Sequence, residues 1–199
     1  MSSLILISAP SGAGKTSLVR QLLTKDSGIK MSVSYTTRAP RVGECNAVDY
    51  NFIDEDKFHS MSVAGEFLES AKVFGNYYGT SKSSVEALLD SGSDVLLEID
   101  WQGALQVKKI FPDSAWVFIL PPSMAALRER LLSRNTNSFQ DLDLRLGEAK
   151  TDIEHASRAD YVVVNSDFDL ACADLHSIFK AKRLEASRHQ ATICDILGN

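Results

Sequence analysis

Short runs of apolar residues recur along the chain, and each is followed by a segment with the spacing of an amphipathic helix. The apolar runs, typical of strands buried on both faces of a parallel sheet, lie at 4–8, 94–99, 115–120 and 161–164. The helical patterns lie at 15–23, 82–89, 102–109, 124–132, 142–156 and 170–187. This alternation predicts right-handed βαβ units and an α/β fold with helices on both faces of the sheet.

Two segments interrupt the alternation. Residues 33–81 contain short, polar, aromatic-rich stretches, which favour a small mixed sheet over another βαβ unit. Residues 133–140 form a polar stretch between two arginine-rich helical patterns. We interpret the first segment as an inserted substrate domain and the second as part of a lid. The expected division is a core of 1–32, 83–126 and 149–199, an insert of 33–82 and a lid of 127–148.

A phosphate-binding loop is predicted directly after the first strand. The sequence there is A-P-S-G-A-G-K-T, which matches G-x-x-x-x-G-K-[ST] except that Ala9 replaces the first glycine. Gly12 and Gly14 permit backbone conformations and a close approach that a Cβ atom would block. Successive N–H groups then point at the phosphates, with Lys15 at the β- and γ-phosphates and the Thr16 hydroxyl on Mg²⁺.

The alternative is a glycine-rich turn with a chance lysine. The strand before the loop and the helix after it supply the context that the motif requires, so we expect a nucleoside triphosphate site. Its expected residues are Ala9, Pro10, Ser11, Gly12, Ala13, Gly14, Lys15, Thr16 and Ser17. The motif does not identify the second substrate.

The insert carries candidate groups for a second anion. Arg38 and Arg41 lie three residues apart in a loop stiffened by Pro40, and Tyr50 and Tyr78 supply phenolic hydroxyls. Two guanidinium groups and two phenols that converge would hold a phosphate monoester by charge-assisted hydrogen bonds. Taken alone, these residues slightly favour a solvated loop with core aromatics over such a site.

Several further motifs lie in one order along residues 4–168. They are T-T-R-A-P-R-V-G-E, V-D-Y-N-F, F-G-N-Y-Y-G-T, I-D-W-Q-G, F-I-L-P-P-S and V-N. Together they resemble the signature of the guanylate kinases, a family of P-loop nucleoside monophosphate kinases. The resemblance implies a three-layer α/β P-loop kinase fold with a parallel core sheet, a small mixed α/β GMP-binding insert and a helical lid. It also implies transfer of the γ-phosphoryl group of MgATP to GMP, with dGMP as a further candidate acceptor.

The resemblance assigns roles position by position. The residues expected to bind GMP are Ser34, Arg38, Arg41, Tyr50, Glu69, Tyr78, Gly79, Thr80 and Asp100. Of these, the two arginines and two tyrosines would hold the phosphate, whereas Ser34, Glu69, Thr80 and Asp100 would recognise the guanine. A carboxylate at Glu69 can accept from both N1–H and N2–H₂ of guanine. Adenine offers neither of these donors, because its N1 carries a lone pair and it has no 2-amino group. For Glu69 alone, a solvated acid on a strand remains the alternative.

The remaining roles concern the donor nucleotide and the transferred phosphoryl group. The resemblance places Lys15, Arg38, Arg134 and Arg145 in catalysis and Asn165 in the ATP site. Arg130 also flanks the polar stretch, but it is equally consistent with an ordinary helix surface. The usual G-R-G around the lid arginine is Ser133-Arg134-Asn135 here, and the usual D-I-D is Glu98-Ile99-Asp100.

The composition argues against several other classes of protein. Of 199 residues, 44% are hydrophobic and 24% charged, as in a globular protein with a real core, and no apolar run approaches the roughly 20 residues of a membrane span. A net charge of −5 argues against binding to a nucleic-acid duplex. The three cysteines are far apart, which fits a reducing compartment, so we expect a cytoplasmic protein. We expect a monomer or a homodimer, since the C-terminal helical pattern could pack internally or against a second subunit. The competing hypotheses are a non-catalytic guanylate kinase-like interaction domain, another P-loop kinase and a nucleic-acid-binding ATPase.

Overall fold

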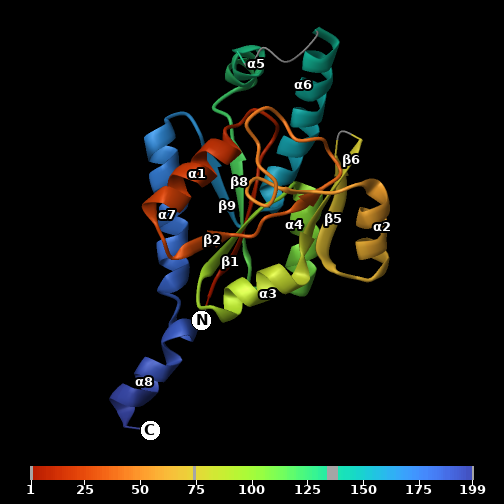
Figure 1. The fold of residues 1–199 in the computed structure, drawn as a ribbon. Coiled ribbons are helices and arrows are strands. Elements are labelled where there is room, and N and C mark those ends of the chain that lie inside the picture. Colours follow the sequence, from red (N-terminus) through yellow and green to blue (C-terminus); the bar gives the residue numbers. More distant parts are fainter. Residues whose placement is uncertain (1, 74, 134–138, 199) are drawn as a thin grey trace.

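Five parallel strands form the central sheet, in the order β2-β7-β1-β8-β9 (Figure 1). Their bounds are Ile29–Met31 (β2), Asp94–Glu98 (β7), Leu4–Ser8 (β1), Ala115–Leu120 (β8) and Tyr161–Val164 (β9). The computed structural model describes residues 2–73, 75–133 and 139–198. The central strand β1 is buried throughout, as its uninterrupted apolar run predicts.

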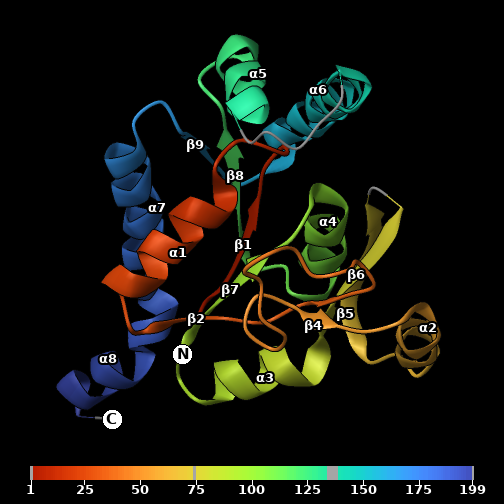
Figure 2. The same ribbon diagram turned by 45° about the horizontal axis from the view of Figure 1, so that its top comes forward.

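Helices cover both faces of this sheet (Figures 1 and 2). They are α1 (Lys15–Lys25) and α7 (Phe168–Arg183) on one face, and α3 (Lys82–Asp90) and α4 (Trp101–Ile110) on the other. Ile5 and Ile7 of β1 pack in the cluster that contains α1 and α7, whereas Leu4 and Leu6 pack in the cluster that contains α3 and α4. The alternation of side chains along β1 therefore builds two separate cores, and the three-layer α/β fold is confirmed.

A second sheet of four strands lies beside the first, in the order β4-β3-β6-β5. The strands are Asn51–Phe52 (β4), Tyr35–Thr36 (β3), Asn76–Ser81 (β6) and Phe67–Val73 (β5), and α2 spans Glu55–Val63. This sheet is mixed, because β3 pairs with β4 in parallel and with β6 in antiparallel fashion. Phe58 of α2 stacks on Phe67 at 4.5 Å between ring centroids, so α2 covers one face. The expected small mixed sheet is present.

Two helices stand above the carboxyl ends of the central strands in Figure 1. They are α5 (Met124–Ser133) and α6 (Phe139–Glu154), followed by a 3₁₀ turn at His155–Arg158. Leu127 and Leu131 of α5 pack with Leu142 and Ala149 of α6 in a small core of their own. Arg134 lies outside the described residues.

The sequence patterns predicted most elements but not all. The short edge strand β2 was missed because only Ile29 of its three residues is buried, which leaves no apolar run. The predicted helix 170–187 is α7, which ends at Arg183, followed by a 3₁₀ turn at Ala186–His189 and α8 at Gln190–Leu197. The helix α8 projects from the body in Figure 1. Among the described residues, no helix has the length and apolar character needed to cross a membrane.

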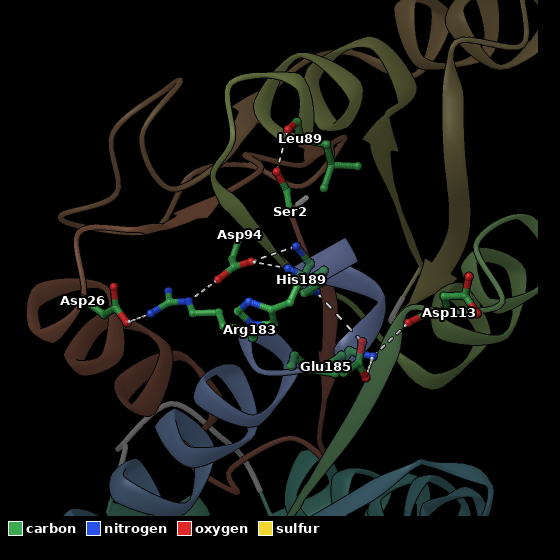
Figure 3. Close-up of polar contacts among 11 residues, drawn as sticks. Ser2, Asp26, Leu89, Asp94, Asp113, Arg183, Glu185 and His189 are labelled. Atoms are coloured by element: carbon green, nitrogen blue, oxygen red, sulfur yellow. Dashed lines mark hydrogen bonds and ion pairs between the residues drawn. The ribbon is translucent and has the colours of Figure 1, made fainter. Parts of the chain in front are cut away.

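A buried ion-pair network ties the start of β7 to α7 and α1 (Figure 3). Asp94 accepts from the Arg183 Nε at 2.5 Å and from the Ser3 backbone N–H at 2.7 Å. Arg183 also donates to Asp26 at 2.7 Å, and its hydrogen bond lowers the pKa of Asp26 to about 2. Because Asp94 is 5% exposed, these partners must replace the water that its carboxylate has lost.

We predict that Asp94→Ala lowers the free energy of unfolding by about 2–4 kcal/mol, because it leaves the Arg183 guanidinium and the Ser3 N–H without their buried acceptor. Urea unfolding followed by circular dichroism measures the change. Arg20→Ala is the control, since it removes the exposed partner of Asp49 and should change stability by less than about 1 kcal/mol. Equal losses in the two variants would contradict the role of the network.

Candidate functional site

One cavity of about 460 Å³ opens at the carboxyl ends of β1 and β7. Its walls come from the loop after β1, from strands β5 and β6 of the second sheet, and from helix α6. The carboxyl edge of a parallel sheet is where ligands bind in open α/β folds. Residues expected to bind two different nucleotides therefore line a single cavity, among them Gly12, Lys15, Thr16, Ser34, Arg41, Tyr50, Glu69, Tyr78 and Asp100.

The loop after β1 has the backbone geometry of an anion site. Gly12 and Gly14 have φ angles of 91° and 94°, in the left-handed region that favours glycine. Gly14 is the N-cap residue of α1, and no side chain caps this helix. The amide groups of the first turn of α1, together with the helix dipole, are thus available to a phosphate.

Two side chains hold this loop from behind. The buried Asn165 amide donates to the Ala13 carbonyl at 2.8 Å, and Arg130 of α5 donates to the same carbonyl at 3.3 Å and to the Asn165 carbonyl at 2.9 Å. A Cβ atom on Gly14 would collide with the Asn165 amide. Asn165 therefore touches the loop backbone, and Arg130, which the sequence left open between lid and surface, belongs to this support.

Lys15 and Thr16 reach from α1 to the end of β7. Lys15 Nζ donates to the Ile99 carbonyl at 3.1 Å, and the Thr16 hydroxyl donates to Glu98 at 2.5 Å. A hydroxyl and a carboxylate side by side are hard oxygen donors of the kind that Mg²⁺ prefers. No three His, Cys, Asp or Glu side chains gather into a metal site within the described ranges. The donor set fits a cation that keeps several waters and phosphate oxygens as ligands.

The two arginines of the insert differ in their surroundings. Arg38 is half-buried and pairs with Glu44 through two hydrogen bonds of 2.9 Å, and its guanidinium lies 5.4 Å from the centroid of the Tyr50 ring. These hydrogen bonds from Arg38 lower the pKa of Glu44. Arg41 is exposed and lines the cavity. Burial, with the charge of Glu98, raises the pKa of Tyr50 to about 12, so its hydroxyl keeps a proton to donate.

A buried carboxyl group lies deeper in the cavity, where β5 meets α4. Glu69 is 4% exposed and accepts from the Thr80 hydroxyl at 2.6 Å, and Thr80 lies 3.2 Å from the Ser34 hydroxyl. Burial raises the pKa of Glu69 to about 7, although the Thr80 hydrogen bond opposes the shift. Asp100 caps α4 by accepting from the Gly103 N–H at 2.7 Å. Carboxyl oxygens from two elements thus face one end of the cavity.

Residues 1–182 match the profile of the family described as guanylate kinase. The chain belongs to the guanylate kinase family. It is 50% identical over 200 residues to the guanylate kinase of Alkalilimnicola ehrlichii, with 98% of each chain covered. It is 54% identical over 185 residues to that of Thiobacillus denitrificans, with coverage of 93% of this chain and 88% of the relative.

Among solved structures, guanylate kinase from Anaplasma phagocytophilum superposes with a TM-score of 0.79 at 34% identity. The match covers 94% of this chain and 89% of that one. Both sheets described above thus belong to a fold that a guanylate kinase also adopts.

Not every residue that the family resemblance named lines the cavity of this guanylate kinase family member. Gly79 lies against the Phe67 ring, and a Cβ atom there would be 2.9 Å from a ring carbon. The absence of a side chain at Gly79 therefore makes room for Phe67. Thr80 is not among the residues that line the cavity, and its hydroxyl donates to Glu69. Burial raises the pKa of Glu148 on the α6 side of the cavity, and Arg145 lies near enough for its charge to oppose that rise. Arg134 falls in the part of the chain that the structure does not describe.

Sequence reasoning missed several cavity residues of this family member, among them Asp152, Glu148 and Trp101. Asp152 and Glu148, one turn apart on α6, line the wall opposite the second sheet, and Trp101 donates to Asp152 at 3.1 Å. Burial raises the pKa of Asp152 to about 6 and also raises that of Glu148. Their four-residue spacing, with Arg145 three residues before Glu148, was the available signal, since it places all three on one helix face.

We predict that the buried Glu69 makes folding less favourable as the pH rises. The unfolded carboxyl has its ordinary pKa of 4.5, so between pH 4.5 and about 7 the folded state binds the extra proton. Its contribution to stability is complete below pH 4.5 and is lost as the pH rises through 7. Relative to the wild type, Glu69→Gln should gain roughly 2–3 kcal/mol of unfolding free energy between pH 5 and pH 8. Urea unfolding across that range measures it, and a constant difference would contradict the prediction.

Proposed function

We propose that this chain catalyses the transfer of the γ-phosphoryl group of MgATP to GMP, which yields ADP and GDP. The observation that carries the proposal is the single cavity shared by Lys15 of the phosphate-binding loop and the buried Glu69 of the second sheet. Membership of the guanylate kinase family supports the same reaction. The same reaction draws on the nucleotide pool, which fits a cytoplasmic enzyme.

The proposed division of labour follows the cavity walls. The phosphate-binding loop and Asn165 take ATP, in a core of 1–32, 83–126 and 149–199. The insert, 33–82, takes GMP, with Arg38, Arg41, Tyr50 and Tyr78 at its phosphate. The lid, 127–148, brings Arg134 and Arg145 to the transferred group.

Guanine recognition rests on acceptors that adenine cannot satisfy. An ionised Glu69 would accept from N1–H and N2–H₂ of guanine, and Asp100, Thr80 and Ser34 would complete the base pocket. Sites built on such hydrogen bonds reject analogues without the partner groups by roughly 10⁴-fold or more. The buried position of Glu69 supports this assignment, because a solvated acid on a strand would be exposed.

The proposed chemistry needs no general base. The second pKa of a nucleoside monophosphate is about 6, so the attacking phosphate is mostly a dianion at neutral pH. The obstacle is the approach of two polyanions in line, and catalysis then consists of positioning and charge neutralisation. Among the described residues, the positive charge comes from Lys15, Arg38, Arg41 and Arg145.

Mg²⁺ would be held by the Thr16 hydroxyl, with the Glu98 carboxylate beside it. When bound, the ion neutralises charge on the β- and γ-phosphates and holds them in the reactive geometry.

We predict that an assay of ADP production shows high turnover with GMP, weaker or comparable turnover with dGMP, and very little with AMP, CMP or UMP. Lys15→Ala should reduce the GMP rate by roughly 10³-fold or more, because the transition-state charge loses its cation. Its unfolding curve should match that of the wild type. A folded wild type that produces no ADP with any monophosphate would instead favour a non-catalytic interaction domain.

We predict that Glu69→Gln lowers kcat/KM for GMP by roughly ten- to several-hundred-fold, since the amide NH₂ opposes one guanine donor in a buried site. The KM for ATP should stay within about twofold of the wild type, because Glu69 lies on the acceptor side. AMP should improve relative to GMP, since the amide can donate to adenine N1. Steady-state kinetics with both acceptors measure the ratio, and an unchanged GMP:AMP ratio would remove Glu69 from base recognition.

A further inference from the structure

The two carboxyl groups at the end of the cavity proposed to hold the guanine come from different elements. Glu69 lies on β5 of the second sheet, whereas Asp100 is the N-cap of α4, at the end of β7 in the central sheet. Under the function proposed above, both contact one guanine ring. Recognition of the ring therefore requires a fixed position of β5 relative to α4, because a shift of about 1 Å weakens hydrogen bonds at both ends.

A side-chain amide joins these two elements next to Glu69. Gln106 of α4 donates from Nε2 to the Ser70 carbonyl at 2.8 Å, and its Oε1 accepts from the Ser70 N–H at 3.2 Å. Both bonds are partly buried. Ser70 directly follows Glu69, so the amide holds the backbone beside the carboxyl group.

The edge position of β5 explains why an amide suits this place. The strand pairs with β6 on one side only, since the sheet order is β4-β3-β6-β5. The backbone groups of Ser70 that face away from β6 have no neighbouring strand, and an unpaired buried N–H or C=O is costly. Gln106 supplies one donor and one acceptor in a single plane, as a neighbouring strand would. Figure 2 shows α4 beside this edge of the second sheet.

One face of α4 contributes both to the end of the cavity lined by Glu69 and Asp100 and to the hydrogen bonds between Gln106 and Ser70. Asp100, Gly103 and Gln106 follow one another at three-residue spacing, which places them along the same side of the helix. Gly103 leaves the room that the carboxyl group needs, because a Cβ there would lie 2.5 Å from Glu69 Oε2. This face of α4 thus carries the Asp100 carboxylate, leaves space for the Glu69 carboxyl group and forms hydrogen bonds with the backbone of Ser70.

We propose that Gln106 is a positioning residue for guanine selectivity. It acts through Glu69 by holding β5 against α4, and it touches neither nucleotide. This inference rests on the proposed function, and it adds a specificity determinant outside the cavity lining. Loss of the two hydrogen bonds should let Glu69 shift relative to Asp100 while the phosphate-binding loop keeps its structure.

The test replaces Gln106 with Met, which has the same length and no polar partner for Ser70. We expect KM for GMP to rise roughly tenfold and the GMP:AMP ratio of kcat/KM to fall several-fold, with KM for ATP within about twofold of the wild type. Gln21→Met is the matched control, an exposed glutamine of α1, and should leave all three values unchanged. Should Gln106→Met fail to fold, Gln106→Glu replaces it, because its oxygen would oppose the Ser70 carbonyl and the same fall is expected.

A double-mutant cycle with Glu69→Gln distinguishes positioning from general support. If Gln106 acts through Glu69, the GMP:AMP ratio of the double variant equals that of Glu69→Gln alone. Multiplicative losses, or equal rises in KM for GMP and ATP, would overturn the inference. A wild type active on GMP with an unchanged ratio in Gln106→Met would overturn it too, and would leave the proposed function standing. A wild type inactive on GMP would overturn both.

Discussion

The uncapped N-terminus of α1 is the constraint on which the rest of the site depends. A helix start normally takes a side-chain acceptor, yet here Gly14 offers none, and the first-turn amides stay available to an anion. A glycine-rich loop with two positive φ angles would be loose without support, since glycine loses more conformational freedom on folding than any other residue. Asn165 and Arg130 supply that support through the Ala13 carbonyl, so α5 and the segment after β9 are structurally coupled to the phosphate-binding loop.

Glu69 is the opposite case, a group whose burial opposes ionisation. Its pKa of about 7 means that desolvation outweighs the Thr80 hydrogen bond. Guanine would supply the two donors that the carboxylate lacks, and binding would then be coupled to ionisation near neutral pH. The buried Asp94 is paired with the Arg183 guanidinium, whereas the buried Glu69 lies in a cavity and accepts from the neutral Thr80 hydroxyl, and this difference favours the recognition role proposed for Glu69.

The sequence predicted the fold through β1, β7 and β8, whose apolar runs are long because helices cover both faces. It could not predict β2, where a single buried residue carries no pattern. In the site, the glycine and lysine spacing identified the loop, because the chemistry is local to eight residues. The insert arginines were ambiguous from spacing, and so was Arg130, because its contact with the Ala13 carbonyl forms only in the folded chain. The pairing of Glu44 with Arg38 was missed for the same reason.

The hydrogen bonds between Gln106 of α4 and Ser70 of β5 show why such contacts cannot be predicted from the sequence. Gln106 and Ser70 are 36 residues apart, and each is an ordinary polar residue in its own element. Their contact arises because β5 is an edge strand, so the outward backbone groups of Ser70 need hydrogen-bond partners. The Gln106 amide of α4 lies within hydrogen-bond distance of these groups. The same helix carries Asp100 at its start, so its N-terminal turns connect the end of β7 to the base end of the cavity. Under the proposed function, guanine selectivity depends on α4, which holds β5 in place, as well as on the carboxyl groups that line the cavity.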